Sequence, residues 1–313
     1  MVNPIQARYF NTITYDSTSG CITKRSTDEQ KLKQEINWYL NLPSALHHYI
    51  PTIENYSLED GNVFITMEYV PYQTLHETYL QHPDWDKKER FFSRLLSVYR
   101  DFSAYDEVSV TSTHLFEMYI EKTLTRLRKL LQQQAWAKAI YDKGKVVINH
   151  HPYPCPLTFL EQNQASLASL FRDPVPQLIH GDLCFSNLFT AEEGEKIIMI
   201  DPRGSFALPG IYGDGRYDVA KVRHSLSGYE HIISDRFYVM QHDNNMEYGI
   251  CQHWEHKKWK EMWDELCPVP LHEIKVIESL LFLSMVPLHV DQPARQLVMY
   301  GLGTKLLYQA LEQ

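Results

Sequence analysis

The sequence has no pair of cysteines at a spacing that would suggest a disulfide framework. Its cysteines are dispersed along 313 residues, at Cys21, Cys155, Cys184, Cys251 and Cys267. An odd and scattered set is typical of reduced thiols in a cytosolic protein. His253 and His256 follow Cys251, but a fourth ligand at a suitable spacing for zinc is missing. We therefore interpret this segment as the start of a solvated helix.

A surplus of positive charge is absent as well. Asp and Glu number 39 against 30 Lys and Arg, which gives a formal net charge of −9. Because nucleic-acid binding depends on a basic surface that releases counterions, we expect no nucleic-acid partner. Basic residues follow one face of a predicted helix, at Lys122, Arg126, Arg128 and Lys129. Glu117 and Glu121 accompany them, so we interpret this face as a solvated surface.

Long apolar runs are also missing. The longest candidate, around Ser279–Val290, is too short to span a bilayer. The first ten residues, MVNPIQARYF, lack the charged region and apolar core of a signal peptide. We therefore expect a cytoplasmic protein without a membrane partner. The 44% of hydrophobic and 22% of charged residues indicate an ordinary folded chain, long enough for two lobes. The sequence does not indicate the oligomeric state.

The most informative stretch is Gln177–Gly204, with the sequence QLIHGDLCFSNLFTAEEGEKIIMIDPRG. It contains two apolar β-runs, Leu178–Ile179 and Ile197–Ile200, with a short run Leu188–Thr190 between them. A polar loop follows the first run, and a Glu-Glu-Gly turn precedes the second. We expect this stretch to fold as a hairpin with its polar residues at one end.

Three oxygen-bearing side chains mark the ends of these runs. Asp182 lies in the loop after the first run, Asp201 closes the second, and Asn187 follows Asp182 at D-x-x-x-x-N spacing. A hairpin can bring all three to one mouth. Mg²⁺ prefers one or two carboxylates and completes its shell with water and substrate phosphates. The spacing therefore indicates a site for phosphoryl transfer.

The segments HGDLCFSN and IDPRG are similar to the signature of the aminoglycoside phosphotransferase and choline kinase family, the small-molecule branch of the protein-kinase-like fold. The resemblance implies an α+β protein with two lobes: a shortened, β-rich N-lobe at 1–70 and a mainly helical C-lobe at 71–313. It also implies ATP and Mg²⁺ as cofactors and a small hydroxyl compound as acceptor. By this resemblance Asp182 is the catalytic base, while Asn187 and Asp201 are the metal ligands. An ordinary β-hairpin with polar turns is the weaker interpretation, because His-Gly-Asp, the Asn and the second Asp occur in order.

The N-terminal region carries further elements of this resemblance. We expect strands at Arg8–Tyr15 and Cys21–Arg25 and a helix at Asp28–Leu40. In the kinase-like fold a strand lysine contacts the ATP phosphates and pairs with a glutamate of the following helix, and Lys24 and Glu35 fit this order. Two solvated charges are nearly as good an interpretation, because other basic groups lie close by at Arg25, Lys31 and Lys33.

A second strand pair is expected at Ile53–Leu58 and Val63–Val70. Its end, MEYVP, resembles the linker between kinase lobes. By this resemblance the carbonyl of Glu68 and the N–H of Val70 would meet the adenine, with Met67 behind it. The alternative is a plain edge of a sheet.

The chain departs from the family pattern at one place, because no G-x-G-x-x-G motif occurs in the N-terminal region. The turn Asp16–Gly20 could cover the phosphates instead, with Ser and Thr hydroxyls and backbone N–H groups. The missing motif keeps a second hypothesis open, a catalytically idle nucleotide-binding or scaffold protein on the same fold. A protein kinase is disfavoured because the D-F-G and A-P-E segments are absent.

The remaining sequence predicts a helical region. We expect helices at Asp86–Tyr105, His114–Tyr141, Leu157–Phe171, Arg216–Tyr229, Leu271–Leu288 and Gln292–Leu311. The prolines of His150–Pro156 predict a connection that no regular element crosses. The resemblance implies that Asp218 anchors a helix near the site and that Tyr238, Asp243 and Glu247 line a substrate pocket. Arg203 could touch a phosphate or pair with an acidic neighbour.

The sequence does not identify the acceptor. Sugars, amino alcohols such as choline, and aminoglycosides all offer a hydroxyl, and the fold does not choose among them. The short N-lobe, HGDLCFSN and IDPRG also look like those of kinase-like proteins associated with bacterial surface-polysaccharide synthesis. This second resemblance favours a sugar or polyol acceptor.

Overall fold

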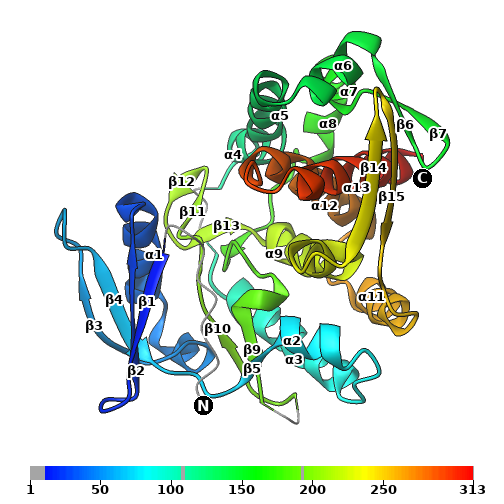
Figure 1. Ribbon diagram of the computed structural model, residues 1–313. Helices are drawn as coiled ribbons and strands as arrows, with labels where there is room; N and C mark the ends of the chain where they lie inside the picture. Colours follow the sequence, from blue (N-terminus) through cyan, green and yellow to red (C-terminus); the bar gives the residue numbers. More distant parts are fainter. Residues whose placement is uncertain (1–10, 107–109, 192–193, 313) are drawn as a thin grey trace.

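The computed structural model describes residues 11–106, 110–191 and 194–312 (Figure 1). The first elements form a four-stranded antiparallel sheet in the order β1-β2-β4-β3. Its strands are β1 Asn11–Asp16, β2 Cys21–Ser26, β3 Ile53–Ser57 and β4 Phe64–Glu68. Helix α1, Glu29–Asn41, and a 3-10 segment, Ser44–Tyr49, connect β2 to β3. Figure 1 shows this sheet and α1 at one side of the molecule and most of the helices at the other.

Helix α1 joins these two sides because it has apolar residues on more than one face. Its N-cap is Asp28, whose side chain accepts the N–H of Lys31. Leu32 and Ile36 are fully buried, at 1% and 0% exposure. Near its C-terminal end the indole N–H of Trp38 donates to the carbonyl of Ile179, at 2.7 Å. The helix that carries Glu35 is therefore fixed to the segment that precedes Asp182.

The rest of the described chain is mainly helical. Its α-helices are α2 Leu75–Gln81, α3 Lys88–Ser103, α4 Ser112–Phe116, α5 Lys122–Gln133, α6 Ala135–Lys143, α7 Pro156–Gln162, α8 Gln164–Leu170, α9 Gly215–His224, α10 Glu230–Ile233, α11 Glu255–Leu266, α12 Leu271–Met285 and α13 Pro293–Leu311. Helix α12 is central, because α5, α9 and α13 all pack against it. Short π-helical segments at Glu117–Glu121 and Ser225–Tyr229 join α4 to α5 and α9 to α10, and a 3-10 turn at Val286–Leu288 follows α12. In the described part of the chain, no helix combines the length and the hydrophobicity that a bilayer crossing demands.

Short strands surround the candidate site. Strand β9 Leu188–Thr190 pairs with β10 Ile197–Met199 and with β5 Gln73–Thr74. Strand β8 Pro176–Leu178 pairs instead with β13 Tyr212–Asp214, and β11 Ser205–Phe206 pairs with β12 Leu208–Pro209. The two apolar runs expected to form the hairpin therefore belong to different sheets, and β9 and β10 form the hairpin. The loop between β8 and β9, which includes a 3-10 turn at Phe185–Asn187, redirects the chain from one sheet to the other.

Three predictions for the helical region were wrong in detail. The helix expected at His114–Tyr141 breaks at Gln134, whose φ and ψ of −133° and 116° are extended. The segment expected at Leu157–Phe171 divides into α7 and α8 at Asn163. The helix expected from Gln292 begins at Pro293, with Gln292 as its N-cap and the proline in its first turn. The sequence patterns were correctly periodic, but a single non-helical residue, such as Gln134 or Asn163, breaks a helix without disturbing the period of its apolar residues.

A four-stranded sheet in the order β14-β15-β6-β7 was not predicted. Its strands are β6 Lys145–Ile148, β7 His151–Pro154, β14 Phe237–His242 and β15 Asn245–Ile250. The proline-rich connection thus does contain a strand, β7. Proline is accepted there because β7 pairs only with β6 and lies at the edge of the sheet. In β14 every second residue is exposed, a strand period that the sequence analysis did not use.

Candidate active site

Charged side chains from three separate elements meet beside α1. The Nζ of Lys24 in β2 lies 2.8 Å from an oxygen of Glu35 in α1 and 2.7 Å from an oxygen of Asp201, which follows β10. Burial alone would lower the pKa of Lys24, but the carboxylates of Asp201 and Glu35 outweigh it and raise that pKa. Burial and the nearby Asp201 raise the pKa of Glu35 to about 7. The other basic candidates lie elsewhere, since Lys31 pairs with Asp28 and Lys33 with Asp60.

The strand register places Met67 on the same sheet face as Lys24. Lys24 lies opposite Ile65, and Ile22 lies opposite Met67, so these side chains point to one side of the sheet. Met67 is 3% exposed. At the end of β4 the N–H of Glu68 donates to Thr52. This bond uses neither the Glu68 carbonyl nor the Val70 N–H. The adenine contacts expected of those two groups therefore stay predictions.

The loop that carries Asp182 is held by its backbone. The N–H groups of His180 and Gly181 donate to the two carboxylate oxygens of Asp218 in α9, at 2.6 and 2.8 Å. The side-chain amide of Asn187 donates to the carbonyl of Asp182, at 2.9 Å. Gly181 has a φ of 79°, which favours glycine. Asp218 is buried, so its carboxylate ties α9 directly to this loop. The resemblance implied that Asp218 anchors this helix near the site.

A second loop brings Asp201 to the first. The N–H of Ile200 donates to the carbonyl of Asn187 at 3.0 Å, and the N–H of Arg203 donates to the carbonyl of His180 at 2.9 Å. The ring of His180 bridges the two loops, because Nε2 contacts the Ile200 carbonyl at 3.0 Å while Nδ1 accepts the N–H of Asp182 at 3.3 Å. Asp201 itself has a φ of 57°, a sharp reversal that Asp tolerates better than most residues. Asp182, Asn187 and Asp201 therefore share one hydrogen-bonded framework.

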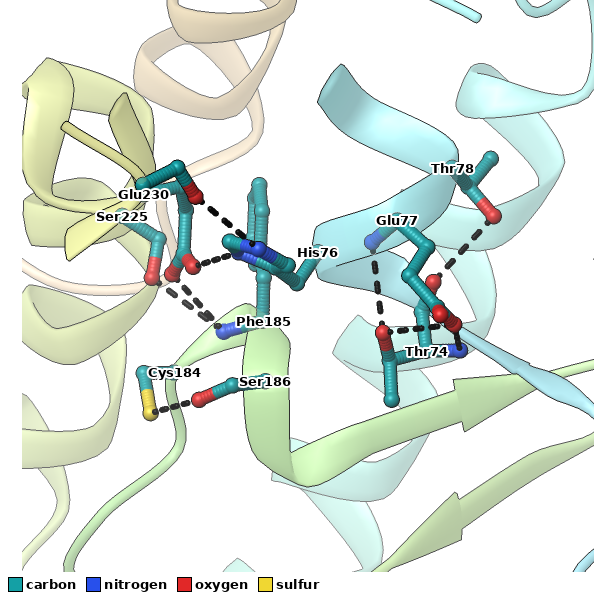
Figure 2. A network of polar contacts seen from close by, with 10 residues as sticks. Thr74, His76, Glu77, Thr78, Cys184, Phe185, Ser186, Ser225 and Glu230 are labelled. Atoms are coloured by element: carbon teal, nitrogen blue, oxygen red, sulfur yellow. Dashed lines mark hydrogen bonds and ion pairs between the residues drawn. The ribbon is translucent and has the colours of Figure 1, made fainter. Parts of the chain in front are cut away.

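Figure 2 shows a further support of the loop between β8 and β9, one that the sequence did not predict. The N–H of Phe185 lies 3.2 Å from the Ser225 hydroxyl and 3.3 Å from an oxygen of Glu230. Glu230 is fully buried, and its other oxygen lies 2.6 Å from Nδ1 of His76 in α2. This network fixes the middle of the loop between Asp182 and Asn187. Nothing in the local sequence distinguishes Glu230 from a surface residue.

Lys221 is a second residue that the sequence analysis missed. Its Nζ lies 2.6 Å from an oxygen of Asp182, and its side chain is 7% exposed against 28% for Asp182. Burial alone would lower the pKa of Lys221, but Asp182 outweighs burial and raises it. Lys221 follows Asp218 by one helical turn, so both face the same loop. The spacing D-x-x-K in GRYDVAK was the signal that could have found it.

The residues present fit a magnesium ion. The Asp201 side chain is 43% exposed, so its carboxylate can be reached by a metal ion. The side-chain nitrogen of Asn187 donates to the Asp182 carbonyl, which leaves the side-chain oxygen of Asn187 for a metal. Within the described ranges, no cluster of three or more His, Cys, Asp and Glu could hold a metal by itself. Such a sparse oxygen set suits Mg²⁺, which takes its other ligands from phosphates and water. Cys251, His253 and His256 form no zinc site in that part of the chain, and His256 is buried, with Nε2 on the Tyr79 carbonyl at 2.8 Å.

Two segments expected to contact ATP or the acceptor make other contacts or lie at the surface. In the Asp16–Gly20 turn, the N–H of Thr18 and the hydroxyl of Ser19 donate to the Asp16 carboxylate, at 2.9 and 2.7 Å, so these donors already have an acceptor. Tyr238, on β14, is 61% exposed. Asp243 pairs with Lys143, and Glu247 lies 3.8 Å from His150. The structure thus places these three expected pocket residues on the β14–β15 hairpin and not beside Asp182.

The fold agrees with solved structures of small-molecule kinases. Choline kinase LicA from Streptococcus pneumoniae is similar with a TM-score of 0.54 and 14% identity, over 96% of this chain and 90% of that chain. A protein assigned as a fructosamine-3-kinase, from Thermobifida fusca, gives 0.51 and 14%, over 94% and 86%. No family model and no curated protein matches the sequence. The chain has the protein-kinase-like α+β fold of these enzymes, which confirms the predicted fold class.

Gly204 controls the approach of α1 to the second loop. It has a φ of 65°, and a Cβ there would lie 2.1 Å from the backbone carbonyl oxygen of Gln34, the residue before Glu35. We expect Gly204→Ala to push α1 away and to weaken Mg·ATP binding at least about tenfold, besides a strain of about 1 to 2 kcal/mol. Gly144→Ala is the matched control, since Gly144 has a φ of 67° with no atom within 4 Å. Equal nucleotide affinity in the two variants, by calorimetric titration, would contradict this.

The burial of His180 leads us to expect a lower free energy of unfolding at acidic pH. Its burial lowers the pKa to about 4, whereas an unfolded His titrates near 6.5. Between pH 7 and pH 4 the unfolded state gains a proton that the folded state does not, so this residue's contribution falls by up to about 3 kcal/mol. Burial raises the pKa of Asp218 and of Glu35 to about 7, which acts in the opposite sense over this range. The measurement is therefore the difference between wild type and His180→Gln in urea unfolding at pH 7 and pH 4.5. A constant difference would refute the prediction.

Proposed function

We propose that this protein is an ATP-dependent phosphotransferase that moves the γ-phosphate to a hydroxyl of a small molecule, such as a sugar, an amino alcohol or an aminoglycoside-like compound. One observation carries the proposal: two ionic groups, Lys24–Glu35–Asp201 and Asp182–Lys221, are tied into one framework through His180 and Asn187. Two similar structures with TM-scores above 0.5 bear the names of small-molecule kinases. The cytoplasm, where ATP is abundant, is the proposed location.

The positions of these residues support one set of roles, which the family resemblance also implies. Lys24, held by Glu35, offsets charge on the ATP phosphates, and Met67, the Glu68 carbonyl and the Val70 N–H receive the adenine. Asn187 and Asp201 hold Mg²⁺, which when bound neutralises charge that develops on the phosphates. The Asp182 carboxylate orients the acceptor hydroxyl and accepts its proton. Most of the rate enhancement would come from positioning and electrostatics.

An idle scaffold on the same fold is the second candidate. The occupied donors of the Asp16–Gly20 turn and the missing glycine-rich motif favour it. Against it, a scaffold has no need of a base, a lysine and two oxygen ligands in one framework.

The experiment is an ADP-release assay with purified protein, Mg·ATP and a panel of hydroxyl acceptors, with product formation checked by mass spectrometry. We expect at least one acceptor to gain 80 mass units, the mass of HPO₃, only when Mg²⁺ is present. Nucleotide binding without phosphorylated product from any acceptor of the panel would favour the scaffold.

A further inference from the structure

Four basic side chains gather close to one another and to Asp182. Lys122 and Arg126 come from α5, Arg203 from the loop after Asp201, and Lys221 from α9. We call these four residues the basic cluster. Helices α5 and α9 both pack against α12, which brings residues distant in sequence together.

The cluster is organised around Tyr217 of α9. A guanidinium nitrogen of Arg203 lies 3.2 Å from the Tyr217 hydroxyl, and the Nζ of Lys122 lies 5.3 Å from the centre of its ring. The stem of Arg203 packs against Gly181, where an added Cβ would lie 2.8 Å from the Arg203 Cβ. Because Gly181 directly precedes Asp182, the cluster is adjacent to the proposed base.

The charges of the cluster are poorly balanced. Within the described ranges, the one ion pair of the cluster joins Lys221 to Asp182. Arg126 donates to the carbonyl of Ser284, at 3.1 Å, and Arg203 contacts a hydroxyl, so both are bonded to neutral groups. Burial, together with Arg203 and Arg126, lowers the pKa of Lys122 well below its usual value. Half-buried cations without a counter-charge are costly, which points to an anion that joins them.

The same helix shows what a surface cation looks like in this protein. Arg128 is 48% exposed and forms an ion pair with Glu161. Lys122 and Arg126 differ from Arg128 in their charged neighbours. They lie one helical turn from each other, a spacing at which like charges destabilise a helix. The sequence pattern favours a solvated surface for this basic face. That interpretation holds for Arg128, but it is wrong for Lys122 and Arg126, whose side chains take part in the basic cluster.

We propose that the basic cluster binds an anionic group, a phosphate or a carboxylate, on the hydroxyl acceptor itself. The inference rests on the proposed function, since it names the class of acceptor for that reaction. Guanidinium groups match both anions with paired N–H donors, and Lys122 adds further N–H donors, whose protonated form a bound anion would favour. Lys24 and Asp201 mark the nucleotide side, so the cluster is left for the acceptor. A cationic acceptor such as choline would be repelled.

The first test compares acceptors in matched sets. Glycerol, ribitol and glucose are the neutral members; glycerol 3-phosphate, ribitol 5-phosphate, glucose 6-phosphate and glucuronate are the anionic members; choline and glucosamine are the cationic ones. We expect kcat/KM for the best anionic acceptor to exceed that of its neutral counterpart at least about 100-fold. Separate phosphate and carboxylate arms identify which anion the cluster prefers. Preference for a neutral or cationic acceptor would overturn the inference.

The second test uses the double variant Lys122→Gln/Arg126→Gln, with Arg128→Gln as control on the same helix. We expect the double variant to raise KM for the anionic acceptor about 10- to 100-fold with a smaller change in kcat, and to leave the stabilisation by Mg·ATP intact. The control should behave as wild type. An unchanged KM in the double variant would overturn the inference.

A third measurement separates this inference from the proposed function. Glycerol 3-phosphate, glucuronate and inorganic phosphate are each added without nucleotide, and the thermal unfolding of wild type, double variant and control is recorded. A shift in wild type and control that is absent in the double variant supports the anion site, even if no phosphotransferase activity is found. Phosphotransferase activity on neutral acceptors, without any such shift, would overturn the anion site and leave the proposed function standing.

Discussion

Replacing Asp182 by Asn is expected to lower kcat at least about 1,000-fold with every acceptor while Mg·ATP still binds. The amide keeps the shape of the side chain but cannot accept a proton from the acceptor hydroxyl. It also releases the ammonium of Lys221, now 2.6 Å from the carboxylate. Steady-state kinetics and a nucleotide titration by calorimetry, on the same preparation, separate the two quantities.

The matched control is Asp264→Asn. Asp264 of α11 pairs with Arg223 of α9, so this variant also removes one carboxylate from an ion pair on that helix. Arg223 keeps a second partner, Glu278. We expect kcat of this control to lie within about threefold of wild type, because a surface-side partner contributes little when another remains. An active Asp182→Asn protein would end the assignment of Asp182 as the base.

Lys24→Met is expected to abolish nucleotide binding and to lower the free energy of unfolding by about 3 kcal/mol, because it leaves Glu35 buried without its partner. Glu35, whose pKa is raised to about 7, then titrates at a higher pH still. A carboxyl with a raised folded pKa contributes its stability at low pH and loses it as pH rises through that pKa. The variant should therefore be more destabilised, relative to wild type, at pH 8 than at pH 6.

The double variant Lys24→Met/Glu35→Gln separates folding from function. The neutral amide removes the unpaired charge, so we expect most of the lost stability to return, while nucleotide binding stays lost. Urea unfolding at the two pH values gives the stability, and calorimetric titration gives the binding. Nucleotide affinity retained in the single variant would show that Lys24 does not contact the phosphates.

The sequence predicted the groups that are close together in the chain or carried by a motif. The Lys24–Glu35 contact was implied by the family resemblance, which pairs a strand lysine with a glutamate of the next helix, and the order of Asp182, Asn187 and Asp201 was visible in one segment of 28 residues. The basic face of α5 shows the limit. Whether a helical side chain faces solvent or a neighbouring helix depends on tertiary packing, which periodicity alone does not contain.

Other features that the sequence did not predict also depend on tertiary contacts. Glu230 supports the loop between β8 and β9 from a distant helix, so no local pattern marks it. Strand β7 contains prolines that exclude a central strand, yet its place at the sheet edge makes them harmless. Gln134 ends a helix although it is a good helix former, because the chain turns there to pack α6. In each case long-range contacts decided an outcome that local propensity left open.

The most direct test of a nucleotide and metal site is thermal unfolding of wild type, Asp201→Ala and Asp243→Ala, each with and without Mg·ATP. Asp243 is the control because its φ is also 57°, so both substitutions carry similar backbone strain. At one hundred times the dissociation constant a ligand adds about 2.7 kcal/mol, or about 4 °C for a chain of this size. We predict this shift, dependent on Mg²⁺, for wild type and Asp243→Ala and its loss in Asp201→Ala. No shift in wild type at millimolar nucleotide, or an equal shift in Asp201→Ala, would contradict the account.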